Sequence, residues 1–384
     1  MRKLFILTLF SVTFACQTVP EPGPLPIVSP LPMPSATPSP FQPNVYLTPT
    51  PGYPEEGYGP DNFPADINPL TGLNTDPALL DRRPMLIKVS NLPRDVRPQS
   101  GLSRADIVYE YYTEEGTTRF IAIFYGKDAE QVGSIRSARF FDEHIIRMYR
   151  GFFVFGSGDE RVRERLYKSS FAEQLIVEWQ ADCPALCRPD PVTNYLMADT
   201  VALHKYVRAQ DLSDERQDLD GMYFRLQSPE GGQAADRVYA WYSVVIYNRW
   251  DYDPPSGRYY RYVDVENTLD SQPEVYKPLR DALGDVPISA DNVVVLLMPH
   301  TFYSKSPEIV EMQFYESGPA YAFRNGQAYE LEWVRANEAG LFFLYTKNGD
   351  EYAFKPGTTW FEVMGLSTEI DRNNNDWRFE MRFP

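Results

Sequence analysis

The residues best suited to chemistry lie between positions 97 and 139, where arginines and serines are mixed with carboxylates. The arginines and serines of this stretch are Arg97, Ser100, Arg119, Arg136, Ser137 and Arg139. A guanidinium presents a planar fork of donors that binds a carboxylate or phosphate through two parallel hydrogen bonds. The stretch therefore predicts a binding site for an anionic ligand. Equally, these arginines can pair with carboxylates inside the fold, and the sequence leaves both interpretations open.

A helix is expected to help position this cluster. Apolar residues recur at helical spacing over residues 137–150, and Ser137 is a suitable N-cap. Arg136 and Arg139 would then lie at the positive end of the helix dipole, where an anion is favoured.

The carboxylates of the same region suggest an alternative chemistry. Glu110, Glu115 and Asp142 could supply the acid and the base of a glycoside hydrolase or lytic transglycosylase. That reaction needs two carboxyl groups ~5–9 Å apart with different pKa values, which one sequence does not establish. In a chain with 53 acidic residues such a pair arises easily, so we favour a protein that is not an enzyme.

Nucleophilic, metal and cofactor chemistry find less support. Gly156-Ser157-Gly158-Asp159 only partly matches the Gly-x-Ser-x-Gly pattern and is more typical of a flexible turn. Cys183 and Cys187 predict either a small disulfide loop or half of a zinc site. The chain has no second Cys/His pair, so the disulfide is the better interpretation, and we expect no metal and no cofactor.

The N-terminus has the features of a secretory signal. A short positive region precedes an apolar run at residues 4–14, which is too short to span a bilayer, and Ala15-Cys16 follows directly. A cysteine at this point predicts a bacterial lipoprotein whose signal, residues 1–16, is cleaved before a lipidated Cys16. A plain secretory signal with an incidental cysteine is the alternative.

The amino-acid composition is typical of an exported protein whose folded part is attached through a flexible tether. Residues 17–63 contain fourteen prolines and no lysine or arginine, which predicts an extended, disordered tether. The net charge of −16 argues against binding nucleic acid or an anionic membrane surface. Any membrane contact is therefore expected only through the lipid anchor.

The rest of the sequence predicts an α+β fold. It consists of an N-terminal mixed α/β domain at residues 64–229 and a mostly antiparallel β domain at residues 230–384. In the first domain we expect strands at residues 85–90, 107–112, 119–125 and 152–155, and helices at 137–150, 159–168 and 198–208. In the second we expect strands at 238–247, 258–263, 291–298 and 309–314, with tight turns at Asn325-Gly326 and Asn348-Gly349.

Several strings carry a resemblance. Asn68-Pro69-Leu70-Thr71-Gly72, Arg97-Pro98-Gln99-Ser100-Gly101-Leu102-Ser103, Ala105-Asp106-Ile107-Val108-Tyr109-Glu110 and Ile135-Arg136-Ser137-Ala138-Arg139 resemble the YerB family of bacterial lipoproteins. The resemblance extends over nearly all the chain beyond the tether. It implies the architecture and an extracytoplasmic location, and it implies no reaction.

The sequence thus predicts a lipid-anchored protein on the outer face of the cytoplasmic membrane. Our first hypothesis is a non-catalytic binding or scaffold protein for an anionic cell-wall glycan or an envelope protein. The alternative is a peptidoglycan-active hydrolase or transglycosylase that uses Glu110, Glu115 or Asp142.

Overall fold

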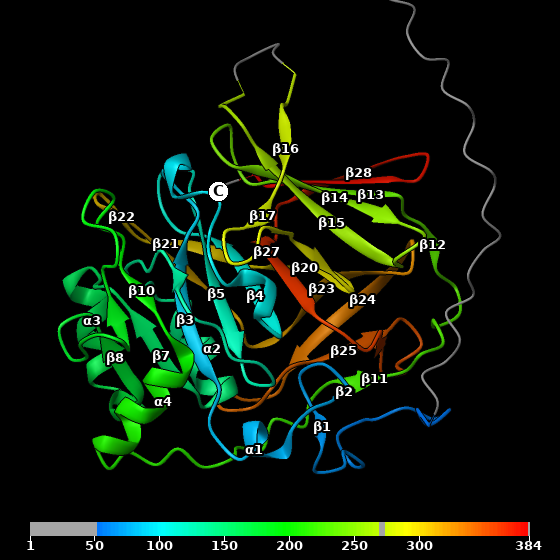
Figure 1. The fold of residues 1–384 in the computed structure, drawn as a ribbon. Coiled ribbons are helices and arrows are strands. Elements are labelled where there is room, and N and C mark those ends of the chain that lie inside the picture. Colours follow the sequence, from blue (N-terminus) through cyan, green and yellow to red (C-terminus); the bar gives the residue numbers. More distant parts are fainter. Residues whose placement is uncertain (1–51, 269–272, 383–384) are drawn as a thin grey trace, which may run out of the picture. The chain divides into compact units, whose positions relative to one another are not determined.

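A computed structural model describes residues 52–268 and 273–382 of the chain (Figure 1). The predicted signal, Cys16 and the tether up to residue 51 lie outside the described residues. The fold is α+β: helices accompany the strands of the N-terminal part, and a mostly antiparallel sheet domain follows.

A large central sheet runs through both parts of the chain. Within the described residues it contains eleven strands. In spatial order they are β12 (Gln233–Ala234), β24 (Gln327–Arg335), β23 (Glu316–Arg324), β20 (Asn292–Met298), β27 (Thr359–Gly365), β4 (Ile107–Tyr112), β5 (Thr118–Phe124), β3 (Met85–Ser90), β7 (Phe152–Phe155) and β8 (Leu175–Val177), with β25 (Phe343–Thr346) beside β24.

The joint between the two parts is the parallel pairing of β4 with β27. β27 also runs parallel to β20, and every residue of these three strands is buried. Near-continuous apolar sequence such as that of β20 is typical of a strand covered on both faces. The N-terminal and C-terminal parts therefore share one hydrophobic core.

A second sheet belongs to the C-terminal part alone. Its order is β16 (Tyr276–Pro278), β15 (Arg258–Asp264), β14 (Tyr247–Asp253), β13 (Arg237–Trp241), β29 (Asp376–Glu380) and β28 (Glu369–Asn373), with β19 (Ser289–Ala290) beside β15. β15 alternates between half-buried and buried residues, so one face packs on the core while the other meets solvent. The fully buried Trp250 of β14 contacts Trp360 of β27 edge to face, which places this sheet against the central one.

The helices gather at the β7–β8 end of the central sheet (Figure 1). They are α2 (Asp142–Tyr149), α3 (Glu160–Tyr167) and α4 (Thr200–Ala209), and the short α1 (Pro77–Leu80) lies apart from them. Asp159 and Asp199 cap α3 and α4 by accepting a backbone N–H hydrogen bond.

Smaller strand pairs complete the described chain. They are β1 (Ile67–Asn68) with β2 (Leu73–Asn74), β6 (Val132–Gly133) with β10 (Met197–Ala198) and β9 (Leu186–Cys187), β11 (Tyr223–Phe224) with β26 (Ala353–Phe354), β17 (Arg280–Asp281) with β18 (Val286–Pro287), and β21 (His300–Lys305) with β22 (Glu308–Met312). Residues 53–63, which the sequence assigned to the tether, pack on the folded body through the Tyr58–Phe224 bridge.

Most predicted strands are confirmed. β3, β4 and β7 have the predicted limits, and β5 begins one residue early. Asn325-Gly326 forms the expected tight turn between β23 and β24, with φ of 51° and 71° at its two residues. Both values are the positive φ that this hairpin turn requires.

Two expectations are wrong, the helix start at Ser137 and the single strand at residues 238–247. The helix begins at Asp142 and not at Ser137, because the backbone before it bonds elsewhere: Arg136 N to Lys88 O and Ala138 N to Ser157 O. Residues 238–247 form parts of two strands joined by a turn. The strand before Asn348-Gly349, β25, pairs along its length with β24, and it also meets the chain after the turn as expected, through the Tyr345–Glu351 bridge and the Tyr352 N to Leu344 O hydrogen bond of 2.8 Å. Residues 371–375 lie in the β28–β29 hairpin.

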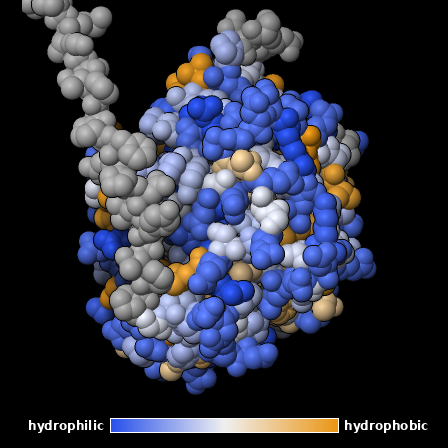
Figure 2. Space-filling view, turned by 90° about the vertical axis from the view of Figure 1, so that its right-hand side faces the viewer, coloured by the Kyte–Doolittle hydropathy of each residue, from blue (hydrophilic) through white to orange (hydrophobic). Residues whose placement is uncertain are grey.

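The face shown in Figure 2 is dominated by hydrophilic residues, with only small separate hydrophobic areas.

Candidate functional site

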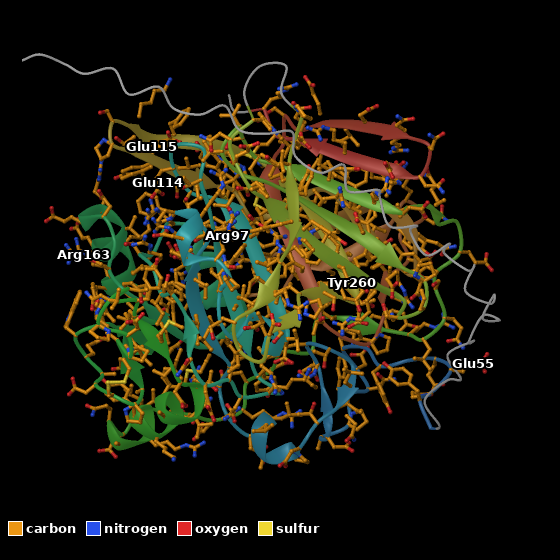
Figure 3. All side chains as sticks on the ribbon, turned by 45° about the horizontal axis from the view of Figure 1, so that its top comes forward. Glu55, Arg97, Glu114, Glu115, Arg163 and Tyr260 are labelled. Carbon is orange, nitrogen blue, oxygen red and sulfur yellow. A yellow bond between two sulfur atoms is a disulfide. The ribbon has the colours of Figure 1, made fainter. Side chains whose placement is uncertain are left out.

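Arg97 is inside the protein and is used by the fold. Its guanidinium donates to the Asp264 carboxylate at 3.1 Å and to the Asn91 carbonyl at 3.0 Å, and its side chain is 1% exposed. Figure 3 places Arg97 in the interior, between the N-terminal strands and the second sheet. This arginine therefore has no free capacity for an external anion.

Arg119 and Arg139 lie together at the β4–β5 hairpin and share one carboxylate. Both donate to Glu114 in the turn, Arg119 at 2.9 Å and Arg139 through Nε at 2.5 Å. Both also donate to the Ser137 carbonyl, so Ser137 takes part through its backbone. Glu114 and Glu115 stand at the end of the hairpin in Figure 3. The structure therefore brings together three of the residues named from the sequence, Arg119, Ser137 and Arg139.

Arg136 is the accessible member of the cluster. Its side chain is exposed, and its Nε donates to the Ser90 hydroxyl at 3.1 Å. No carboxylate within the described residues forms an ion pair with it. Of the four arginines named from the sequence, Arg136 is thus the one best placed to meet a ligand.

The cluster has more positive than negative charge. Lys88 pairs with Asp142 at 2.9 Å, and Glu114 is left to balance Arg119, Arg136 and Arg139. Burial and the neighbouring charge of Arg139 lower the pKa of Arg119 to about 10, with Arg136 adding to the effect. Burial alone would raise the pKa of Glu114, but Arg139 and Arg119 hold it below its usual range. Such crowding of like charges is eased by an anion.

A pocket of about 330 Å³ lies beside the cluster. Three chain segments form it: the turn at residues 95–100, the strand end at Gly133-Ser134, and the loop at residues 189–197. Ala282 and Leu283, from the β17–β18 hairpin, close the fourth side. Ser100 lines the pocket and exchanges backbone hydrogen bonds with Gly133 at 3.0 and 3.1 Å.

The hairpin wall is held in place by Asp281. This buried carboxylate accepts from the backbone N–H of Gly101 and Ser103, both at 2.7 Å, and from Leu283 N at 2.8 Å. Because Gly101 and Asp281 belong to different halves of the chain, the pocket is built from both.

The three carboxylates named as candidates for catalysis differ in their exposure to solvent. Glu110 and Asp142 are both 0% exposed, whereas Glu115 is exposed at the hairpin turn. Asp142 accepts from Lys88 Nζ, from the Tyr111 hydroxyl and from Arg139 N. A substrate has no access to either buried carboxyl, so the geometry offers nothing to support glycan cleavage by them.

Glu110 belongs to a buried ion network that the sequence did not reveal. Arg261 of β15 donates to Glu110 through Nη2 and to Glu362 of β27 through Nη1, the latter at 2.8 Å. All three side chains are 0% exposed. Neutral donors complete the network: Asn91, Thr118, Tyr242, Asn248 and Trp250. The network links β4 and β27 of the central sheet to the second sheet.

The predicted disulfide is present between Cys183 and Cys187. It precedes the pocket loop, in which Arg188 pairs with Glu178. Among residues 52–268 and 273–382, no helix has the length and apolar composition needed to cross a bilayer. In that same part of the chain, no group of His, Cys, Asp and Glu side chains is arranged to hold a metal ion.

The sequence interpretation missed Glu114, Lys88 and Ser134 as members of the site region. Lys88 could have been noticed, because a lysine within the apolar run Met85-Leu86-Ile87-Lys88-Val89 needs a buried partner. For Glu114 and Ser134 the sequence carries no comparable signal.

These features define an α+β protein of two parts that share a sheet and form a pocket between them. Two family models match it: the N-terminal domain of the protein of unknown function DUF3048 at residues 70–209, and its C-terminal domain at residues 238–361. Together the matches span well over half of the chain, which belongs to the DUF3048 family.

The resemblance to the YerB family is confirmed. The chain is 27% identical over 308 residues to "Putative lipoprotein YerB" of Bacillus subtilis (strain 168), covering 77% of this chain and 85% of that protein. The crystal structure of YerB from Bacillus subtilis shares the fold, with a TM-score of 0.63 at 23% identity over 77% of this chain and 96% of that one.

Proposed function

We propose that this protein is an extracytoplasmic, lipid-anchored protein of the cell envelope that binds an anionic cell-wall glycan without cleaving it. The observation that carries the proposal is the arginine cluster: Arg119 and Arg139 share Glu114, and Arg136 is exposed with no carboxylate partner among the described residues. The net charge of −16 also supports the arginine cluster as the binding site, since the rest of the protein repels an anionic polymer.

The envelope location is supported by the N-terminal sequence and by the similarity to a protein named as a lipoprotein. In this arrangement Cys16 carries the lipid, and the proline-rich stalk holds the folded body within the wall. The anchor supplies the membrane contact, and the arginine cluster faces the wall polymer.

Replacing Cys16 by serine is expected to release the protein from the membrane, because serine provides no thiol for acylation. In cell fractions probed with an antibody, wild type should be found with membranes and Cys16→Ser in the soluble or secreted fraction. Similar release of both proteins would instead indicate a plain secretory signal and would refute the anchor.

Replacing Arg136 by alanine is expected to reduce retention on anionic wall polymer about 1.4- to fivefold per contact. An exposed ion pair contributes about 0.2–1 kcal/mol, and repeated contacts on a polymer multiply the effect. The measurement is sedimentation of the full chain with purified cell walls at 50 and 300 mM salt. Retention should fall with salt, because exposed ion pairs are screened.

Two controls make this result specific. Lys205→Ala removes one exposed positive charge from α4 and should leave retention unchanged. Walls stripped of their anionic polymers should retain the wild type poorly. If Arg136→Ala and wild type sediment equally, the cluster is not the binding site; if wild type is not retained at all, glycan binding is excluded and a protein partner becomes the remaining candidate.

A further inference from the structure

The pocket beside the arginine cluster contains a buried hydroxyl that the fold does not satisfy. Ser134 lines this pocket and is 5% exposed. Its Oγ is buried and has no hydrogen-bond partner among the described residues. Buried polar atoms in native proteins nearly always have a partner, so an unpartnered hydroxyl on a residue that lines a pocket points to a ligand.

The pocket walls offer further hydroxyl and carboxylate oxygens. The hydroxyl of Tyr195 is hydrogen-bonded to Asp95, and Thr193 lies on the same side. Asp190 uses its two oxygens within its own turn, accepting from Val192 N at 2.8 Å and Thr193 Oγ1 at 3.0 Å. Asp95 is therefore the carboxylate with capacity left for a ligand.

Positive charge lies next to the pocket and not within it. Arg97 is a lining residue, but Asp264 and Asn91 occupy its guanidinium. Arg136 lies next to the pocket wall, because its Nε donates to Ser90 Oγ at 3.1 Å and Ser90 N donates to the carbonyl of the lining residue Ser134 at 2.9 Å. A ligand that fills the pocket would therefore place neutral groups inside and its anionic group toward Arg136.

We infer that the pocket binds one sugar ring of the anionic glycan, with ring hydroxyls on Ser134 and Asp95 and the acidic substituent toward Arg136. This inference rests on the proposed function and names the part of the polymer that is recognised. The cavity volume of about 330 Å³ is at the lower end of small-molecule pockets. Pro98, Met197 and Leu283 provide apolar surface for the C–H face of a ring.

A cationic ligand fits the pocket less well. An ammonium group would pair with Asp95, the lining carboxylate with capacity left. However, it would be repelled by Arg136, and it would leave the buried Ser134 hydroxyl unexplained.

The test uses two monosaccharides that differ by one acidic group: N-acetylmuramic acid, which carries a carboxylate, and N-acetylglucosamine, which does not. Binding of each to the full chain is measured by titration followed by NMR. Ser134→Ala is expected to weaken both sugars about three- to tenfold, the range for one lost hydrogen bond. Arg136→Ala should weaken only the acidic sugar.

The controls separate binding from folding. Ser170→Ala makes the same change at an exposed serine outside the pocket and should have no effect on either sugar. Ser134→Ala should keep the wild-type unfolding midpoint, because the lost hydroxyl has no partner.

Each other outcome overturns the inference. If cell walls are retained but neither sugar binds, or if Ser134→Ala leaves sugar affinity unchanged, the pocket is not the ring site although the proposed function stands. If lysine methyl ester binds instead of the sugars and Asp95→Asn abolishes this binding, the pocket is a cation site. If neither walls nor sugars bind, the proposed function itself fails.

Discussion

The Arg261→Met variant is expected to lose about 3–5 kcal/mol of the free energy of unfolding. In the folded protein this guanidinium lies between Glu110 and Glu362, and all three side chains are fully buried. Removing one partner of a buried ion network leaves uncompensated charge in a medium that solvates it poorly. Methionine retains much of the arginine volume, so the loss reports the missing positive charge and not a cavity.

Urea unfolding at pH 7.5 measures this loss, and two further variants identify its cause. Arg249→Met removes a half-buried arginine of β14 that binds Asp251, and it should cost less than about 1 kcal/mol. The triple variant Glu110→Gln/Arg261→Met/Glu362→Gln removes every charge of the network and should recover much of the stability. A loss in Arg261→Met no greater than that in Arg249→Met would contradict the argument.

The position of this network explains why the two parts act as one folded body. Glu110 lies in the segment matched by the N-terminal family model, whereas Arg261 lies in the segment matched by the C-terminal one. Their ion pair crosses from the central sheet to the second sheet. Together with the β4–β27 pairing it ties the two family domains along a buried surface, so they are expected to unfold in a single transition.

Local features of the sequence sufficed to predict many elements. Apolar runs of strand length gave β3, β4 and β7 with their correct limits, because the pattern that marks a buried strand lies in residues that are close in sequence. Asn325-Gly326 predicted its hairpin because few residues tolerate positive φ at both turn positions. The disulfide between Cys183 and Cys187 could be predicted since only four positions separate them.

Pairings between distant residues could not be predicted in this way. A charged residue inside an apolar strand, such as Glu110 or Glu362, shows that a buried partner must exist. Its identity depends on which strands become neighbours and in which register. Arg261 is 151 positions from Glu110, and Asp264 is 167 positions from Arg97. The sequence left open that Arg97 pairs with a carboxylate inside the fold, and the fold supplies a distant one, Asp264.

The candidate site shows the same limit. The sequence could predict that Arg119, Arg136 and Arg139 lie close together, because they flank one hairpin and the loop packed beside it. The expected helix start at Ser137 was not correct, since tertiary hydrogen bonds hold that backbone in another conformation. The pocket has no local signal at all, because its walls come from four separate segments.

The contribution of Glu110 to the free energy of unfolding is expected to fall as the pH rises from about 4.5 to about 7. Burial raises the pKa of Glu110 from 4.5 to about 7, against the attraction of Arg261 and with added repulsion from Glu362. One guanidinium cannot neutralise two buried carboxylates, so a proton bound by the pair stabilises the folded state. Between these pH values the folded state holds more protons than the unfolded state, and the free energy of unfolding therefore decreases with rising pH.

Comparison of wild type with Glu110→Gln isolates this contribution, because every other titrating group is present in both proteins. Glutamine has the same shape and no proton to release, so the variant should gain roughly 3 kcal/mol relative to wild type between pH 4.5 and pH 8. Urea unfolding at pH 4.5, 6, 7 and 8 gives the difference directly, and Glu115→Gln, at the exposed turn, serves as the control with no such gain. A difference between Glu110→Gln and wild type that stays constant over this range would show that Glu110 keeps an ordinary pKa and that the buried network is balanced without a proton.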